Sequence, residues 1–444
     1  MTSLTQQTDL LQPGSVWRNW GRSQRVTPAH TARPTSIEDV VAVVNAARER
    51  GLTVKAVGAG HSFTSIAATD GVQVDVSALD GVWAVDGNRV TLGAGTNLYQ
   101  LPALLDPLGL ALTNMGDIDR QTIAGATSTG THGTGALFGG IATQIRAVTL
   151  VTAAGEILHV SETENPDLLP AAALGLGALG IVVDVPIECV PSFALHAVEI
   201  PEPLEEVLDD FAARATGVDH FEFYWFPHTD TALTKSNTRL PAGTTPVRQS
   251  AVAAWVDDEL LSNGVFALTC GLGTMAPGVI PRINRIADKL VAKRDITDAS
   301  YRIFVADRRV RFREMEYAIP RENVPEALRA IRALVAERGW KISFPIEVRV
   351  AAADDLWLST ASGRESGYIA VHRYYREDPT AYFEGVEAIM RAFGGRPHWG
   401  KMHFQDADSL ATVYPRFDDF RAVRDRLDPE RLFTNDYLRK VLGS

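Results

Sequence analysis

The sequence has little of several features that would assign a function at once. Its 444 residues include two cysteines, Cys189 and Cys270, which are too few for a disulfide framework and form no metal-ligand cluster. Both lie in apolar runs, which predicts buried, unreactive thiols. The longest apolar stretch, Leu174 to Val183, is far shorter than the ~20 residues of a membrane span. We therefore expect no disulfide scaffold, no bound metal and no membrane partner.

Clustered positive charge is also absent. The net charge is −11, lysine and arginine form no long run, and no basic stretch is interleaved with aromatic residues. Such a composition favours solubility and disfavours nucleic acid or an anionic membrane as a partner. Residues Met1 to Gln6 lack the charged and apolar segments of a secretory signal, so we expect a cytoplasmic protein.

What remains is the composition of an ordinary folded protein, with 45% apolar and 22% charged residues. The length suffices for two domains and a large core. Strands and helices do not alternate regularly in the first part of the chain. This favours an α+β domain over a doubly wound one.

Hydrophobic periodicity predicts the main elements. A helix is expected after Pro34, with Thr35 as its N-cap and Glu38 as the capping-box partner. Hairpins should turn at Asp86-Gly87 and Ala154-Gly155. Farther along, helices are predicted at 280–293, 323–338 and 380–393, and strands at 301–306, 341–350 and 367–373. Helices covering one face of an antiparallel sheet would suit a substrate-binding cap.

The most informative stretch is Val57-Gly58-Ala59-Gly60-His61-Ser62-Phe63, which directly follows a short β-branched run. Its glycines permit a sharp turn whose backbone N–H groups can converge on a pyrophosphate. Phe63 stands where the Rossmann fingerprint needs a third glycine, so an NAD-type loop is disfavoured. The alternative is a plain glycine turn that holds a core histidine.

Residues 114–135 read as a long loop that is rich in Gly, Thr and Ser and ends in Thr131-His132-Gly133-Thr134-Gly135. So long a loop inside a compact domain is usually functional. Its small residues would let a flat ring system lie close to the backbone. The alternative is a flexible surface loop.

Two stretches near the C-terminus carry candidate chemistry. Residues 344–350 alternate, so Glu347 and Arg349 share one face of a strand while their neighbours point into a core. Such a pair can bind hydroxyls and stabilise a developing alkoxide, or it can be a surface ion pair worth little. Residues 397–403, if extended, would place Trp399, Lys401 and His403 on one face; a solvated lysine is the alternative.

Taken together, these motifs resemble the vanillyl-alcohol oxidase type of flavoprotein, and within it the sugar-lactone and alditol oxidases. The resemblance runs over nearly the whole chain, and its order makes it specific. Further motifs that carry it are Asn19-Trp20, Gly116-Asp117-Ile118-Asp119, Gly125-Ala126-Thr127, Gly177-Ala178-Leu179-Gly180, Glu316-Tyr317-Ala318-Ile319-Pro320, Pro397-His398-Trp399-Gly400-Lys401 and Asn435-Asp436-Tyr437.

The resemblance implies an α+β fold with a two-part FAD-binding domain of the PCMH type and an α+β cap with an antiparallel sheet flanked by helices. The expected division is residues 1–192 for the FAD domain, 193–395 for the cap, and 396–444 for a return to the FAD domain. It also implies FAD attached covalently through His61. Neither cysteine falls in a loop suited to a second attachment.

The site residues follow from the same resemblance. Glu347, Arg349 and Lys401 would be catalytic, and His372 and His398 would contact the substrate, although for His372 a satisfied strand histidine is an equal alternative. The expected cofactor-binding residues are Val57, Gly58, Ala59, Gly60, His61, Ser62, Gly116, Asp117, Gly125, Ala126, Thr127, Thr129, Thr131, His132, Gly133, Gly180 and Ile181.

The implied reaction is hydride transfer from a hydroxyl-bearing carbon to the flavin, which supplies the redox chemistry. The expected substrate is an aldono-1,4-lactone such as L-gulono-1,4-lactone, with an ascorbate-type product and with O₂ or another acceptor taking the electrons. Oxidation of an alditol is the nearest alternative. An NADPH-using flavin reductase and a non-catalytic sugar-binding protein are the others; His61 disfavours the reductase, and Glu347, Arg349 and Lys401 disfavour the binding protein.

Overall fold

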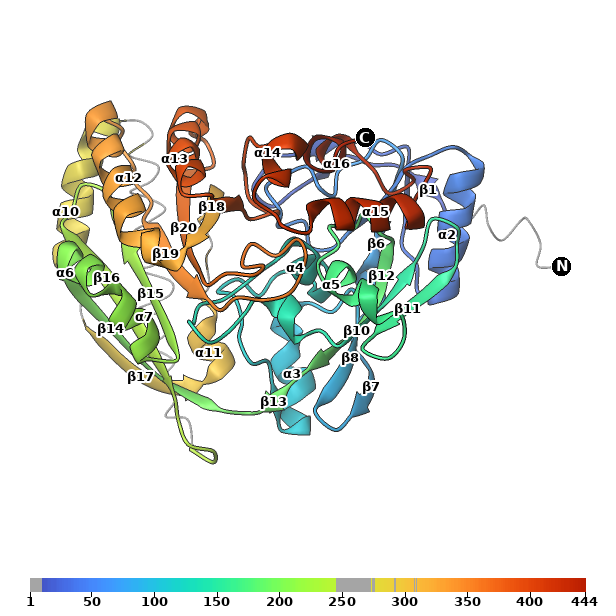
Figure 1. Ribbon diagram of the computed structural model, residues 1–444, viewed down its shortest axis with the longest axis horizontal. Helices are drawn as coiled ribbons and strands as arrows, with labels where there is room; N and C mark the ends of the chain where they lie inside the picture. Colours follow the sequence, from blue (N-terminus) through green and yellow to red (C-terminus); the bar gives the residue numbers. More distant parts are fainter. Residues whose placement is uncertain (1–9, 245–272, 274–275, 291–292, 307, 309) are drawn as a thin grey trace.

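We describe the protein from a computed structural model that covers residues 10–244, 273, 276–290, 293–306, 308 and 310–444. The chain forms two halves that lie side by side (Figure 1). One half carries two smaller sheets, and the other is built on one large sheet. Within the described residues, no helix combines the length and the apolar character that crossing a bilayer requires. Cys270 lies outside the described residues.

The first sheet holds the glycine loop. Its four strands run in the order β1 (Gln12–Pro13), β4 (His30–Ala32), β6 (Val72–Asp75) and β5 (Val54–Val57), and β6 pairs in parallel with both β4 and β5. Helix α2 (Ile37–Glu49) packs its valines against this sheet. Its N-cap is Ser36 rather than the expected Thr35, because the Ser36 hydroxyl accepts the Asp39 N–H while Thr35 donates to the Asp39 carboxylate.

The second sheet is antiparallel and has five strands, in the order β11 (Ile157–Ser161), β10 (Ala147–Val151), β12 (Ile181–Glu188), β8 (Arg89–Gly93) and β7 (Val82–Asp86). Both expected hairpins are present, with β7 paired to β8 and β10 paired to β11. Helices α3 (Leu101–Leu105) and α5 (Leu169–Ala172) and the short strands β2 (Trp17–Arg18), β3 (Arg25–Val26), β9 (Leu110–Ala111) and β13 (Val190–Pro191) complete this half. Cys189 is buried, and burial together with the nearby Glu188 charge raises the pKa of its thiol to about 11.

The segment 114–135 is not a continuous loop. It contains helix α4 (Ile123–Thr129), capped by the Thr122 side chain, which accepts the Gly125 N–H, and ended by Gly130 at φ +81°. The sequence expectation missed this helix because its small residues carry no apolar stripe. Its buried face packs near the strands of the second sheet and leaves the two ends of the segment free to line a cavity.

The large sheet has eight antiparallel strands, shown at the left of Figure 1. In spatial order they are β17 (Arg294–Ala299), β14 (Ala194–Pro203), β16 (Thr231–Arg239), β15 (His220–Trp225), β19 (Ile346–Ala351), β20 (Ser366–Tyr374), β18 (Phe312–Pro320) and β21 (Arg396–Pro397). The described helices of this half are α6 (Leu204–Asp209), α7 (Phe211–Gly217), α10 (Ile280–Leu290), α11 (Ser300–Phe304), α12 (Val324–Arg338) and α13 (Thr380–Ala392).

The strand predicted at 301–306 is wrong, because Ser300–Phe304 is helix α11 and the polar run Arg294–Ala299 before it is the edge strand β17. The helix buries Ile303 and Phe304 against the second sheet's core, so packing overrides the β-propensity of the aromatic run. The strands predicted at 341–350 and 367–373 are found as β19 and β20, and the predicted helices as α10, α12 and α13.

The two faces of the large sheet differ sharply in polarity. Strands β15, β19, β20 and β18 turn alternate apolar side chains toward α6, α7, α12 and α13, where they form the largest apolar cluster. The intervening residues of the same strands, which point to the opposite face, include Glu222, Glu347, Arg349, His372, Glu314 and Glu316. The sheet therefore presents buried ionisable groups to the half that carries the glycine loop.

The C-terminal helices α14 (Ala407–Ala411), α15 (Phe417–Leu427) and α16 (Asp436–Leu442) pack on the half formed early in the chain (Figure 1). Asn435 donates to backbone carbonyls of Ser65, Ile66 and Ala68 at 2.8–3.0 Å. Lys55 Nζ lies 3.2 Å from the carbonyl oxygen of Phe433. The predicted boundaries stay a prediction; they fall just before β14 and at the start of β21.

Candidate functional site

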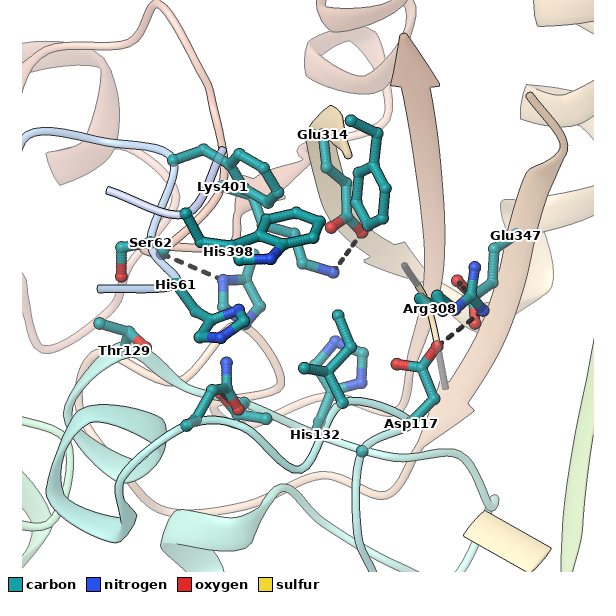
Figure 2. A pocket seen from close by; sticks show the side chains of 18 of the residues that line it. His61, Ser62, Asp117, Thr129, His132, Arg308, Glu314, Glu347, His398 and Lys401 are labelled. Atoms are coloured by element: carbon teal, nitrogen blue, oxygen red, sulfur yellow. Dashed lines mark hydrogen bonds and ion pairs between the residues drawn. The ribbon is translucent and has the colours of Figure 1, made fainter. Parts of the chain in front are cut away.

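Two adjoining hollows of ≈ 680 Å³ and ≈ 870 Å³ meet at the glycine loop. The first lies between the two halves, whereas the described residues that line the second all belong to the half formed early in the chain. His61, Ser62, Gln121 and Thr129 line both hollows, so the two form one elongated cavity with His61 at the junction. Figure 2 shows the smaller hollow, which we call the reaction pocket; we call the other the glycine-loop cavity.

The glycine-loop cavity has walls of small residues. Glycine, alanine, serine and threonine together predominate among the described residues that line it, including Gly58, Ala59, Gly60, Gly125, Ser128, Gly177 and Gly180. A Cβ at Gly58 would lie 2.1 Å from the Thr122 hydroxyl, so the side chain of any other residue would disrupt the start of α4. Gly60 has φ +69°, which favours glycine. A cavity lined by the glycine loop and by the start of α4 places backbone N–H groups where the pyrophosphate part of FAD could accept them.

The loop is held in place from two sides. The Asn19 side chain donates to the carbonyl of Ser62 at 2.8 Å, and the Trp20 N–H donates to the carbonyl of Gly60 at 2.9 Å. On the other side the Phe63 N–H donates to the carbonyl of Gly400 at 2.6 Å. This last bond brings the glycine loop and the turn that carries Lys401 together at the reaction pocket.

Most of the expected cofactor-binding residues line the cavity. Val57 to Ser62, Gly125, Thr129 and Gly180 border the glycine-loop cavity, and Gly116, Asp117, Thr131 and His132 border the reaction pocket. Four others are not among the described lining residues: Ala126, Thr127, Gly133 and Ile181. Ala126 and Ile181 are buried in apolar clusters, and the Thr127 hydroxyl bonds back to the carbonyl of Ile123, so these residues support the wall from behind.

His61 lies at the junction of the two hollows. Its ring stacks on Trp20 with centroids 5.4 Å apart. Burial, assisted by the charge of Arg120, lowers the pKa of His61 to about 4. The imidazole is therefore neutral at neutral pH and keeps a lone pair with which it can act as a nucleophile.

Glu347 and Arg349 lie together on the polar face of β19, as the alternation predicted, and both line the reaction pocket. They form an ion pair, and the Arg349 Nε lies 2.9 Å from Glu222 on the adjacent strand β15. Tyr224 donates to Glu347 at 3.1 Å. Burial outweighs the arginines and raises the pKa of Glu347, whereas the three neighbouring carboxylates raise that of Arg349.

Asp117 joins this cluster from the opposite half of the molecule (Figure 2). Its carboxylate lies 2.6 Å from Arg308 and 3.4 Å from Arg349. Burial alone would raise the pKa of Asp117, but the two arginines hold it well below its usual range. Sequence reasoning missed Arg308 and assigned Asp117 to the cofactor alone; the structure makes it the anion between two arginines that both come from the other half.

Lys401 lies in a turn, not in the extended segment expected for residues 397–403. The Lys401 N–H donates to the carbonyl of His398 at 2.9 Å, which closes the turn after β21. The turn sends Trp399 into the core beside Tyr414, and His403 to the hydroxyl of Tyr437. Only Lys401 of the three side chains reaches the pocket.

Two glutamates that the sequence expectation did not select hold the Lys401 ammonium. Glu314 lies 2.6 Å and Glu316 2.9 Å from Nζ, and both are on β18. Burial would raise the pKa of Glu314, but Lys401 and then His372 outweigh it and lower it to about 2. The same pairing raises the pKa of Lys401 against the effect of burial, so its side chain stays charged.

Three histidines complete the pocket wall. His372 and His398, expected to contact substrate, and His132, expected to contact cofactor, all line it. His398 Nδ1 accepts the Gly400 N–H at 3.1 Å, so its ring proton is on Nε2. Burial and the Lys401 charge lower the pKa of His398 to about 3. This ring is therefore neutral.

His132, Glu316 and His398 each bring one potential ligand atom within 4.8 Å of the others, a spacing that could suit a metal ion. The Glu316 oxygen in this group already lies 2.9 Å from the Lys401 ammonium and 3.1 Å from His132 Nε2. The Lys401 ammonium therefore already pairs with the carboxylate of this group, and a metal ion would have to compete with it for Glu316.

Comparison with known proteins identifies the family. A model described as an FAD binding domain matches residues 28–161, and one described as D-arabinono-1,4-lactone oxidase matches residues 185–441. The L-gulono-1,4-lactone dehydrogenase of Mycobacterium tuberculosis is 45% identical over 96% of this chain and 99% of its own. The L-gulonolactone oxidase of Bos taurus is 36% identical and the alditol oxidase of a Streptomyces species 31%, each over 96% of this chain and 98% of its own.

The fold is also that of a solved structure. The cholesterol oxidase of Brevibacterium sterolicum superposes with a TM-score of 0.79 at 18% identity, over 97% of each chain. The fold and the matched domain together define an FAD-dependent oxidoreductase of the two-domain type. Within that class, the chain belongs to the D-arabinono-1,4-lactone oxidase family.

Proposed function

We propose that this protein oxidises an aldono-1,4-lactone such as L-gulono-1,4-lactone, using FAD, toward an ascorbate-type product. The observation that carries the proposal is the convergence of Glu347, Arg349 and Lys401 on one pocket that His61 also lines. When bound, FAD supplies the acceptor for a hydride from the hydroxyl-bearing carbon. A cytoplasmic location fits the net charge of −11.

The residues of the pocket would orient the sugar ring. Arg349 offers a planar fork of donors, and its three carboxylate neighbours hold it rigidly in place. Lys401 adds a fixed ammonium from the far side of the pocket (Figure 2). Preorganised donors of this kind stabilise the negative charge that develops on a substrate oxygen as its proton leaves.

We propose that His61 attaches FAD covalently. The neutral imidazole at the junction of the two hollows supports this role, because a protonated ring could not form the bond. After acid precipitation of the purified protein, the yellow colour should stay with the pellet. Colour that leaves with the supernatant of an active preparation would contradict the attachment.

We propose that O₂ or another electron acceptor reoxidises the flavin. Gly130 and Thr131 at the end of α4 put little bulk beside the reaction pocket, which favours access by O₂. Activity should therefore be measured in parallel with O₂ and with a dye acceptor. Turnover with the dye alone would identify a dehydrogenase.

The test of the substrate class is a screen of aldono-1,4-lactones against alditols at equal concentration, with both acceptors. We expect kcat/KM to be highest for a lactone. A higher kcat/KM for xylitol or sorbitol would instead assign the chain to alditol oxidation, the activity named for one relative that is 31% identical. Absence of turnover with both classes would contradict the proposed function.

A further inference from the structure

Five ionisable side chains, all buried except the half-buried Lys401, form a continuous chain along one wall of the reaction pocket. In order they are His372, Glu314, Lys401, Glu316 and His132. The successive contacts measure 3.4, 2.6, 2.9 and 3.1 Å. The proposed function uses Lys401 from this chain to bind substrate but gives its two terminal histidines no chemical step.

Each terminal histidine has an oxygen acceptor at both ring nitrogens. His372 Nδ1 lies 3.0 Å from the carbonyl of Pro345, and Nε2 faces Glu314. His132 Nδ1 lies 2.8 Å from the carbonyl of Gly133, and Nε2 faces Glu316. A carbonyl can only accept, so each Nδ1 carries its proton. Each Nε2 then faces a carboxylate and forms a good hydrogen bond only when it is protonated too.

The charges of the chain decide how many protons it holds. Two carboxylates and one ammonium sum to −1, so one protonated histidine makes the chain neutral. Lys401 lies nearer to Glu314 than to Glu316, so it neutralises the charge of Glu316 less completely. A second cation would therefore stabilise Glu316 more than Glu314. The His132–Glu316 contact is also the shorter of the two terminal ones. These contacts favour His132 over His372 as the holder of that proton, which leaves the Nε2 lone pair of His372 beside a carboxylate.

We propose that His372 Nε2 accepts the proton that the substrate hydroxyl loses. This inference rests on the proposed function. The substrate C–H bond breaks and its hydride goes to FAD with both electrons; the O–H bond breaks and its proton forms the new N–H bond on His372. The C–O single bond becomes a carbonyl. The five-residue chain gains a positive charge as the neighbouring cofactor gains a negative one, so the two changes favour each other.

The other groups of the pocket are less suited to accept this proton. The proton of His398 is already on Nε2, and its Nδ1 lone pair is used by the Gly400 N–H. Asp117 is held as an anion by two arginines. Glu347 would have to break its ion pair with Arg349. Among the described residues, the charged group paired with His372 is Glu314 on β18, which Lys401 contacts in turn. The rings of Phe312 and Phe344 and the carbonyl of Pro345 also contact His372.

The direct test counts protons. The holoenzyme is reduced anaerobically by L-gulono-1,4-lactone at pH 7 in weak buffer with a pH indicator, while flavin bleaching is recorded in the same cuvette. The ascorbate-type product is acidic and itself loses one proton at pH 7 in every variant. Beyond that proton, wild-type protein should release about none per flavin reduced, and His372→Gln should release about one. One additional proton released by the wild type, or no additional proton released by either protein, would overturn the inference. Failure of the lactone to bleach the flavin would count against the proposed function instead.

Three further variants test which residue retains the proton. Glu314→Gln keeps the shape but removes the carboxylate that stabilises the new N–H, so it should release a proton like His372→Gln. His196→Gln is the matched control, because His196 also faces a carboxylate, Asp295 at 2.7 Å, but on the surface; it should behave as wild type. Proton release by Glu347→Gln together with retention by His372→Gln would make Glu347 the acceptor and overturn the assignment.

A second readout needs no substrate. The ¹⁵N signals of the histidine rings are compared between oxidised and photoreduced holoenzyme, with His372→Gln used for assignment. The Nε2 of His372 should change from the chemical shift of a neutral ring to that of an imidazolium on reduction, while the His132 ring is an imidazolium in both states. An unchanged His372 signal would contradict the inference even if the lactone proves to be the substrate.

Discussion

Replacing Arg349 by Met tests whether the buried charge cluster is balanced as its contacts indicate. Among the described residues, Arg349 forms ion pairs with Glu347, Glu222 and Asp117, and the other cations paired with these carboxylates are Arg308 and Lys235. With Arg349 present, the cluster of three cations and three anions is neutral. The variant leaves it at −1 in the interior, and removing one partner of a buried ion pair costs about 3–5 kcal/mol.

For a cooperative unit of about 150–250 residues, each kcal/mol lowers Tm by about 2–4 °C, so calorimetry should find a decrease of roughly 6 °C or more. The double variant Glu347→Gln/Arg349→Met restores neutrality and should recover most of this loss. In the single variant, the folded-state pKa of Glu347 should rise further above its unfolded value. Protonation of Glu347 at lower pH then favours the folded state, so the loss of stability relative to the wild type should become smaller as the pH falls from 8 to 5. An unchanged Tm, or a double variant less stable than the single one, would refute the charge balance.

Three other expectations concern the cofactor and the lysine. Gly58→Ala should lower the ratio of bound flavin to protein several-fold, because its Cβ would lie 2.1 Å from the Thr122 hydroxyl, whereas Gly217→Ala, with nothing within 4 Å, should bind flavin normally. Covalent attachment to apoprotein should proceed at a constant rate from pH 8 to pH 5.5, because the pKa of His61 is lowered to about 4; a rate that halves near pH 6.5 would indicate an ordinary histidine. Lys401→Met should slow flavin reduction by about 10²-fold, as loss of a preorganised donor does; an unchanged rate constant in stopped-flow measurements would remove it from the chemistry.

The sequence predicted those features that depend on local pattern. The alternation of residues 344–350 placed Glu347 and Arg349 on one face, and the glycine loop marked the cavity that the structure forms around it. The segment around Lys401 is a turn, although the sequence predicted an extended segment. No turn signal in the neighbouring residues predicts the hydrogen bond from the Lys401 N–H to the carbonyl of His398.

What escaped prediction depends on strand order. Glu222, Glu314 and Glu316 come from β15 and β18, whose pairing with β19 and β20 involves residues far apart in the chain. A signal was nevertheless present, since each glutamate interrupts an apolar strand, and a charge in a buried strand needs a partner. Asp117 gave no such signal, because its partner Arg308 lies on the other half of the molecule.

The central claim is that a lactone gives up a hydride in the pocket where Glu347, Arg349 and Lys401 converge. Anaerobic stopped-flow reduction by L-gulono-1,4-lactone tests it most directly, read from the loss of the oxidised flavin band. The wild type should bleach in a single turnover, and Arg349→Ala should bleach about 10²–10³-fold more slowly. Absence of bleaching by the lactone, or a near-normal rate constant in the variant, would contradict the account.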